Sequence, residues 1–360
     1  MNVLVIGIIM MTIVKSNMIL GLRLLSKLHH PVFHHIAKHS IFRYMATSSS
    51  IFGTDISTSN LTIESAHRLA AKWLEQQNVP EPSESSRHLI MHAANLGTRY
   101  SDFQKNIHKV LSPSQPFFEH LVQQRAQRVP VQYIIGSWDF YGLHIICQPP
   151  ILIPRPETEE LVEKALEDLN SIKRTKQEVL DVGAGTGVIG IALCAQMPET
   201  HVTAIDINPQ AVKLARQNAL HNLQNSQRYS VIESDFLSFS QQTHLNGRKL
   251  FDMIISNPPY IPSNQLAGLQ AEVVQFEDKA ALDGGERGLD IIMQLVEWGG
   301  RLLSPEGTKV MWLEVDTSHP ALITELFYDN KLNKDKYGIE AVCSYKDLSG
   351  NPRFVRIKYV

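Results

Sequence analysis

A glycine-rich turn between an apolar segment and a helix-like segment is the strongest constraint on how this chain folds. Val179-Leu180-Asp181-Val182 is short and apolar, as buried strands are, and Gly183-Ala184-Gly185-Thr186-Gly187 follows it directly. Glycines permit positive φ angles and let a backbone approach a ligand closely, and the start of the next helix offers unpaired N–H groups. The turn therefore predicts a nucleotide-like ligand at the carboxyl end of a parallel sheet.

From this turn onward, strand-like and helix-like segments alternate along the chain. Further strands are predicted at 202–205, 230–232, 253–255 and 309–315, and helices at 187–197, 209–221 and 289–303. Such alternation predicts an α/β fold with a parallel, doubly wound, Rossmann-like sheet. Residues 340–343 and 354–358 are predicted to close this sheet as an antiparallel pair.

The part of the chain before the sheet has a different pattern. Apolar residues at helical spacing predict a small helical domain over 55–132, with these residues packed in its core. Residues 133–153 predict a β-hairpin linker. The 360 residues therefore divide into an N-terminal segment, 1–54, the helical domain, the hairpin and an α/β domain over 154–360.

The N-terminal segment contains no aspartate or glutamate, and its charged residues are Lys15, Arg23, Lys27, Lys38 and Arg43. This composition, with its serines, is typical of a mitochondrial transit peptide, so we expect a mitochondrial matrix protein from which the segment is removed. Two alternatives remain open. Residues 3–14 could form a membrane anchor, although about 12 residues are fewer than the roughly 20 of a spanning helix. The true start could also be Met11 or Met18.

Charge argues against a stable nucleic-acid partner. The chain has a net charge of −2, and removing the five positive charges of the N-terminal segment leaves −7 for the remainder. The processed chain therefore lacks the basic footprint of a nucleic-acid-binding protein. Cys147, Cys194 and Cys343 lie far apart and in no metal-ligand spacing, which predicts reduced thiols and no metal site.

The glycines alone leave the identity of the cofactor open. Gly185, Gly187 and Gly190 also satisfy the G-x-G-x-x-G pattern of dinucleotide-binding enzymes. Asp206 ends the next predicted strand, where a carboxylate accepts hydrogen bonds from ribose hydroxyls in either kind of protein.

Two features favour S-adenosyl-L-methionine over a dinucleotide. Asp181 before the glycines resembles the Asp-x-Gly-x-Gly-x-Gly of class I methyltransferases, and Asp235-Phe236 follows the third strand. We predict that Asp235 bonds the adenine amino group and that Phe236 packs on the adenine ring. The alternatives are a helix cap for Asp235 and core packing for Phe236.

Asn257-Pro258-Pro259-Tyr260 is the most specific motif in the chain. Two successive prolines fix φ and remove N–H donors, which gives a rigid turn with free carbonyl groups. The Asn257 amide oxygen and the Pro258 carbonyl are predicted to accept both hydrogens of a substrate NH2 group, and Tyr260 to pack against a planar group. Such acceptors raise the electron density of a poorly nucleophilic amide nitrogen and aim it at a methyl donor. The alternative is a structural proline-rich turn.

Three further segments resemble those of the PrmC/HemK release-factor glutamine methyltransferases. They are Pro130 to Gly136, Ile151 to Glu159, and Phe276 to Gly285 with Gly288-Leu289. Together with the order of the motifs, the resemblance covers roughly residues 60–360. The chain departs from the family pattern at Val129, where a glutamate is frequent, and at Phe236, where bacterial relatives often have tryptophan. Neither change removes a group that methyl transfer requires.

The resemblance implies cofactor contacts from Gly183 through Gly187, Asp206, Phe236 and Asn257. It implies that Asn257 through Tyr260 hold a glutamine side chain, which is methylated at N5 within the Gly-Gly-Gln motif of a peptide-chain release factor. The transit-like segment indicates mitochondrial release factors. We expect a monomer without a membrane span.

Four other functions remain as alternatives. They are an adenine-N6 nucleic-acid methyltransferase, a protein-lysine methyltransferase, a non-catalytic assembly factor that kept the fold, and a nicotinamide oxidoreductase. An adenine-N6 methyltransferase would need a basic groove for nucleic acid, and the net acidic processed chain argues against one. A nicotinamide oxidoreductase would leave Asn257 through Tyr260 without a role.

Overall fold

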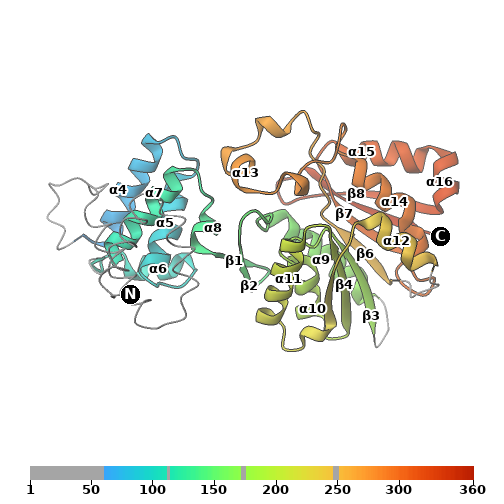
Figure 1. Ribbon diagram of the computed structural model, residues 1–360, viewed down its shortest axis with the longest axis horizontal. Helices are drawn as coiled ribbons and strands as arrows, with labels where there is room; N and C mark the ends of the chain where they lie inside the picture. The colour runs from blue at the N-terminus through green and yellow to red at the C-terminus, as the bar shows by residue number, and fades with distance from the viewer. Residues whose placement is uncertain (1–60, 112–113, 172–175, 246–250) are drawn as a thin grey trace, which may run out of the picture. The chain divides into compact units, whose positions relative to one another are not determined.

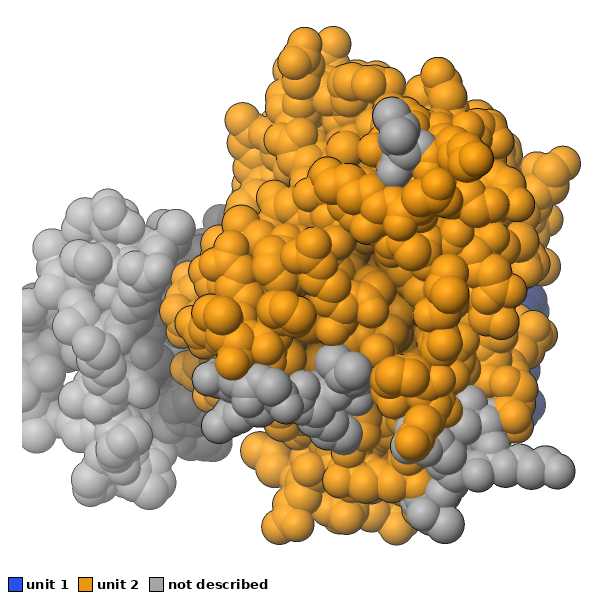
Figure 2. Space-filling model, turned by 90° about the vertical axis from the view of Figure 1, so that its right-hand side faces the viewer, with its two compact units in different colours: residues 1–131 blue, residues 132–360 orange. Residues whose placement is uncertain are grey.

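The computed structural model describes residues 61–111, 114–171, 176–245 and 251–360. The N-terminal segment lies outside the described residues, so its transit role stays a prediction. The chain divides into two compact units, Met1–Val131 (unit 1) and Gln132–Val360 (unit 2). Figure 1 labels the helices and strands of both units, and Figure 2 shows one face of unit 2 in space-filling form. Within the described ranges, no helix is both long and apolar enough to cross a membrane.

The described residues of unit 1, 61–111 and 114–131, are helical, as predicted. Its helices are α4 (Ile63–Gln76), α5 (Pro82–Ala93), α6 (Tyr100–Asn106) and α7 (Gln115–Ala126), and α8 (Val131–Ile135) begins at its last residue. Thr62 caps α4 by accepting the Ser65 N–H at 3.2 Å. The apolar stripe of α4 is buried, including Ala66, Ala70 and Leu74, each 0% exposed. Unit 1 thus has its own core.

The predicted hairpin consists of β1 (Ser137–Phe140) and β2 (Leu143–Ile146), which pair antiparallel. It belongs to unit 2, where two asparagine side chains of helix α11 (Pro209–Asn222) bind its backbone. Asn218 accepts the Ile146 N–H at 2.8 Å, and Asn222 accepts the His144 N–H at 3.1 Å. The hairpin is therefore fixed to the α/β body by side-chain hydrogen bonds to its backbone.

The sheet of unit 2 has the strand order β5-β4-β3-β6-β7-β9-β8. Its strands are β3 (Gln177–Val182), β4 (Thr200–Asp206), β5 (Tyr229–Glu233), β6 (Met253–Ser256), β7 (Val310–Glu314), β8 (Ile339–Lys346) and β9 (Pro352–Tyr359). The first five run parallel, and β9 is antiparallel to both β7 and β8. The parallel sheet and the antiparallel pair at 340–343 and 354–358 are confirmed.

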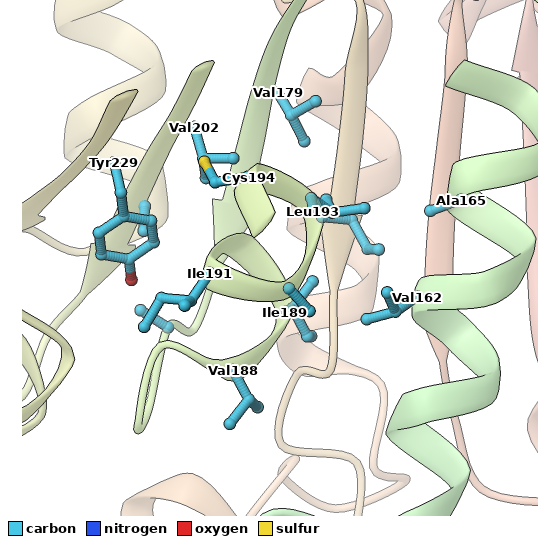
Figure 3. Close-up of a cluster of buried hydrophobic side chains, with 14 of the residues drawn as sticks. Val162, Ala165, Val179, Val188, Ile189, Ile191, Leu193, Cys194, Val202 and Tyr229 are labelled. Carbon is cyan, nitrogen blue, oxygen red and sulfur yellow. The ribbon is translucent and has the colours of Figure 1, made fainter. Parts of the chain in front are cut away.

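Helices cover both faces of this sheet. They are α9 (Pro156–Asn170), α10 (Val188–Gln196) and α11 on one face, and α12 (Phe236–Leu245), α14 (Asp290–Leu302), α15 (His319–Ile323) and α16 (Lys331–Tyr337) on the other. Figure 3 shows side chains of α9, α10, β3, β4 and β5 converging in the first core. Along β7 successive residues alternate between the two cores, which explains why the strand is apolar throughout.

The order of the strands reverses between β3 and β6, which are neighbours in the sheet. In doubly wound sheets, ligands bind at such a switch point, outside the carboxyl ends of the strands. The glycine-rich turn follows β3, Asp206 ends β4, and Asn257 follows β6. The fold therefore brings the predicted site residues to one edge of the sheet.

Candidate active site

The glycine-rich turn has the backbone geometry that its sequence predicts. Gly183, Gly185 and Gly187 have φ angles of +78°, +55° and +87°, which residues with side chains rarely adopt. The N–H groups of Gly183 and Ala184 donate to the Ile205 carbonyl at 2.9 and 3.0 Å, which ties the turn to β4. Apart from chain neighbours, no described residue has an atom within 4 Å of where a Cβ on Gly185 would lie. The backbone at this point is open to a ligand.

Asp206 supports the turn from the end of β4. Its Oδ2 accepts the Gly185 N–H, and its Oδ1 accepts the Asn208 N–H, each at 2.8 Å. Burial raises the pKa of Asp206, and these two hydrogen bonds oppose the rise because they favour the charged form. The half-buried carboxylate holds the turn and keeps acceptor capacity for a ligand.

Asp181 and Thr186 lie on the protein side of the turn. Asp181 is 0% exposed, and its Oδ2 accepts the Gly190 N–H of α10 at 3.1 Å. Burial raises the pKa of this carboxyl to about 7. Thr186 is 2% exposed, and its carbonyl accepts from Asn218 Nδ2 at 2.9 Å. Both residues hold the turn in place against the helices behind it.

Asp235 and Phe236 have structural roles that the sequence left as alternatives. Asp235 is exposed, and its Oδ1 accepts the Ser238 N–H at 2.9 Å, which caps α12 and lowers the pKa of the carboxyl. Phe236 is 6% exposed and packs in the core that contains Val182 and Ile205. Their predicted contacts with adenine stay predictions.

Asn257 lies directly beside the glycine-rich turn because β3 and β6 are paired. A methyl group on Gly183 would lie 3.7 Å from the main-chain oxygen of Asn257. The Ser256 hydroxyl also donates to the Val182 carbonyl at 2.7 Å. Pro258 is buried, whereas Asn257 and Tyr260 are half-buried. The predicted cofactor site and the predicted substrate site are therefore adjacent.

Two residues that sequence reasoning missed contact this motif. Asn257 Nδ2 donates to Thr158 Oγ1 at 3.2 Å, and Thr158 Oγ1 donates to Glu314 Oε2 at 2.8 Å. The Tyr260 hydroxyl makes a long contact of 3.5 Å with Glu314 Oε1. Thr158 lies on α9 and Glu314 ends β7, so three distant segments meet here. Burial raises the pKa of Tyr260.

The segment after the motif is attached to the same edge of the sheet. Arg155 Nη2 and Glu277 Oε2 are 2.6 Å apart, which joins the segment before α9 to the end of α13 (Ala271–Phe276). Asn208 Nδ2 donates to Asp278 Oδ2 at 2.7 Å, beside the end of β4. The only local signal for these contacts is that Ile151 to Glu159 and Phe276 to Gly285 carry the family resemblance.

The sheet order, the reversed strand β9, the glycine-rich turn and the Asn-Pro-Pro-Tyr motif define an S-adenosylmethionine-dependent methyltransferase of class I. A human protein, the MTRF1L release factor glutamine methyltransferase, is 36% identical over 305 residues, which are 82% of this chain and 88% of that protein. The chain belongs to the release factor glutamine methyltransferase family.

Further comparisons of sequence agree with this assignment. The release factor glutamine methyltransferase of Koribacter versatilis is 35% identical over 295 residues, covering 82% of this chain and 98% of that protein. The family "PrmC N-terminal domain" matches residues 65–136, and the family "Methyltransferase small domain" matches residues 165–286. A solved glutamine-N5 methyltransferase from Alicyclobacillus acidocaldarius covers 58% of this chain and 95% of its own, with 23% identity and a TM-score of 0.36.

Proposed function

We propose that this chain transfers a methyl group from S-adenosylmethionine to the side-chain nitrogen of the glutamine in the Gly-Gly-Gln motif of mitochondrial peptide-chain release factors. The observation that carries the proposal is the position of Asn257-Pro258-Pro259-Tyr260 directly beside the glycine-rich turn. In a member of this family, the turn and the motif have the roles of cofactor site and acceptor site. We further propose that the chain acts as a monomer and has no stable nucleic-acid partner.

The residues at the glycine-rich turn fit the cofactor. Gly183 through Gly187 offer an open backbone and the start of α10, and Asp206 offers a carboxylate for ribose hydroxyls. Ile207 is 66% exposed beside Asp206, so its apolar side chain is free to pack against an adenine ring. The cofactor supplies an electrophilic methyl group on a sulfonium. Asp235 is proposed to bond the adenine amino group and Phe236 to pack on the adenine ring.

The acceptor site needs only to orient and polarise the glutamine amide. The Asn257 amide oxygen and the Pro258 carbonyl accept its two N–H groups, and Tyr260 packs against its plane. Pro259 keeps the turn rigid between them. Accepting both hydrogens raises the electron density on the nitrogen and aims it at the methyl carbon. One of these protons then leaves the nitrogen for solvent.

The acid-free N-terminal segment supports a mitochondrial location. The human relative is named for the MTRF1L release factor, which is consistent with a release factor as substrate. We propose that residues 1–54 direct the chain to the matrix, and that the helical domain at 55–132 recognises the release factor.

A transfer assay tests the proposal. The full chain is incubated with methyl-labelled S-adenosylmethionine and a purified mitochondrial release factor, and the product is mapped by mass spectrometry. The control is the release factor with the glutamine of its Gly-Gly-Gln motif replaced. We expect one methyl group on that glutamine and none in the control. Label on adenine of added nucleic acid, or on lysine, would instead support one of the alternatives.

Asp206→Ala is expected to raise the Kd for S-adenosylmethionine at least about tenfold. The change removes a charged acceptor for ribose and also the hydrogen bond from the Gly185 N–H that holds the turn, and bonds to charged groups contribute about 1.5–3 kcal/mol each. Isothermal titration measures the Kd. Glu199→Ala, at the opposite end of β4, is the matched control and should leave the Kd unchanged. An unchanged Kd in Asp206→Ala would contradict the role of Asp206.

A further inference from the structure

Asn257, Thr158 and Glu314 form a hydrogen-bonded chain that the proposed function does not yet use. The two bonds are 3.2 Å from Asn257 Nδ2 to Thr158 Oγ1 and 2.8 Å from Thr158 Oγ1 to Glu314 Oε2. Thr158 is 2% exposed and Glu314 is 1% exposed. Because both side chains are buried, bulk water does not compete for these bonds, and each group depends on its neighbours in the chain.

The chemistry of the three groups fixes the direction of each bond. An ionised carboxylate can only accept, so the Thr158 hydroxyl must donate to Glu314. That hydroxyl has one hydrogen, which is then used, so it can only accept from Asn257. Of the two ends of the Asn257 amide, only the NH2 group donates. The amide oxygen is therefore turned away from Thr158.

We propose that Thr158 and Glu314 are positioning residues that hold the Asn257 amide with its oxygen, and not its NH2 group, toward the substrate. The inference rests on the proposed function, because that orientation is useful only to a substrate that donates N–H groups. An amide flipped by half a turn would present donors to the donors of glutamine, and no hydrogen bond would form. Glu314 also contacts the Tyr260 hydroxyl, so one carboxylate is linked to Tyr260 directly and to Asn257 through Thr158.

Charged and titratable groups face Glu314 from several elements. Arg155 and Glu157 lie at the start of α9, Arg353 lies on β9, and the Tyr260 phenol follows β6. Burial outweighs the hydrogen bond from Thr158 and the nearby arginines, and it raises the pKa of Glu314 to about 7. A protonated carboxyl can donate to Thr158, which reverses the chain and allows the amide to flip. The proposed orientation is thus stable when Glu314 is ionised and is lost as pH falls below about 7.

Thr158→Val and Thr158→Ser in the full chain test the proposal. Valine keeps the shape without the hydroxyl, and we expect kcat to fall about 100-fold because a misplaced contact group has an effect of that order. KM for the release factor and Kd for the cofactor should stay within a few-fold. Serine retains the hydroxyl and should restore most of kcat. At saturating cofactor, wild-type kcat should fall about tenfold per pH unit below pH 7, as for one essential ionised group, and this dependence should vanish in Thr158→Val.

Glu314→Gln is the second variant, because it remains informative if Thr158→Val does not fold. A neutral amide can donate to or accept from Thr158, so we expect a lower kcat that no longer falls between pH 7 and pH 6. The proposal is overturned if Thr158→Val keeps wild-type kcat, or if Glu314→Gln keeps the wild-type pH profile. Failure of the proposed function is distinguishable, since the wild-type chain would then not methylate the release-factor glutamine at all.

Discussion

Asn257→Ala is expected to lower kcat for glutamine methylation about 100- to 1,000-fold. Removing one preorganised hydrogen-bonding group at a reacting centre has an effect of this size. Folding should change little, because the half-buried side chain contributes one hydrogen bond, to Thr158, to the described structure. Single-turnover transfer of labelled methyl measures the rate, and thermal unfolding of the same sample verifies the fold.

Asn264→Ala is the matched control for this experiment. Asn264 lies on the same segment, four residues after Tyr260, and it is exposed. Its loss should leave kcat at the wild-type value. If Asn257→Ala kept more than about a tenth of the wild-type rate, Asn257 would contribute less than about 1.4 kcal/mol to the transition state, and the acceptor role would be wrong.

Loss of Arg155 is expected to lower the free energy of unfolding more than loss of Glu277, its partner in an ion pair. The Glu277 side chain is 1% exposed, whereas that of Arg155 is 32% exposed. Arg155→Met leaves a buried carboxylate without its cation, and we expect a loss of about 3–5 kcal/mol in the free energy of unfolding. Glu277→Gln leaves an arginine that water can still reach and a neutral acceptor for it, so its loss should be nearer 1 kcal/mol. Denaturant unfolding of both variants measures the difference.

The pH dependence of Arg155→Met gives a second test of the same pair. Burial already raises the pKa of Glu277 above its ordinary value, and removing the arginine raises it further. A carboxyl whose pKa is higher in the folded than in the unfolded chain destabilises the fold when it is ionised, that is, when pH lies above the folded-state pKa. This destabilisation disappears as pH falls through the folded-state pKa toward the unfolded-state value. Arg155→Met should therefore approach wild-type stability as pH is lowered from 8 to 5. The double variant Arg155→Met/Glu277→Leu should recover stability at pH 8.

Lys279→Met serves as the control for this pair. Lys279 is 76% exposed and lies 4.0 Å from Asp283, so its ion pair is screened by water. Its removal should leave the unfolding curve almost unchanged at every pH. If Arg155→Met and Glu277→Gln lowered the free energy of unfolding equally, burial of the Glu277 carboxylate would not be the cause of the loss.

The sequence predicted those parts of the site that are encoded locally. A few consecutive residues are enough to recognise a glycine-rich turn, a double proline or an apolar strand. Gly183, Gly185 and the motif from Asn257 were therefore predicted from the sequence. Helix α9 was missed although its apolar residues have helical spacing and Pro156 stands in its first turn. The helical spacing of these residues is therefore sufficient to predict the helix.

Glu314 was missed for a different reason. An acidic residue at the end of a strand does not by itself indicate a functional role. The side chains that it contacts depend on which strands are neighbours in the sheet. β7 lies beside β6 in space, although more than fifty residues separate Glu314 from Tyr260 in sequence. Asp235 shows a related limit: its position after a strand fits both a ligand contact and a helix cap. The structure shows the cap for α12, and the predicted contact with adenine stays a prediction.

The position of β9 has a consequence for how this protein is made. β9 follows β8 in sequence but lies between β7 and β8 in the sheet. A chain that is still being synthesised, and has been extended only as far as Lys346, presents β7 as an unpaired edge, which is an aggregation hazard. Glu314 sits at the end of that edge. Chaperones should therefore retain the nascent chain until Pro352–Tyr359 is available, and the enzyme should become active in a single late step.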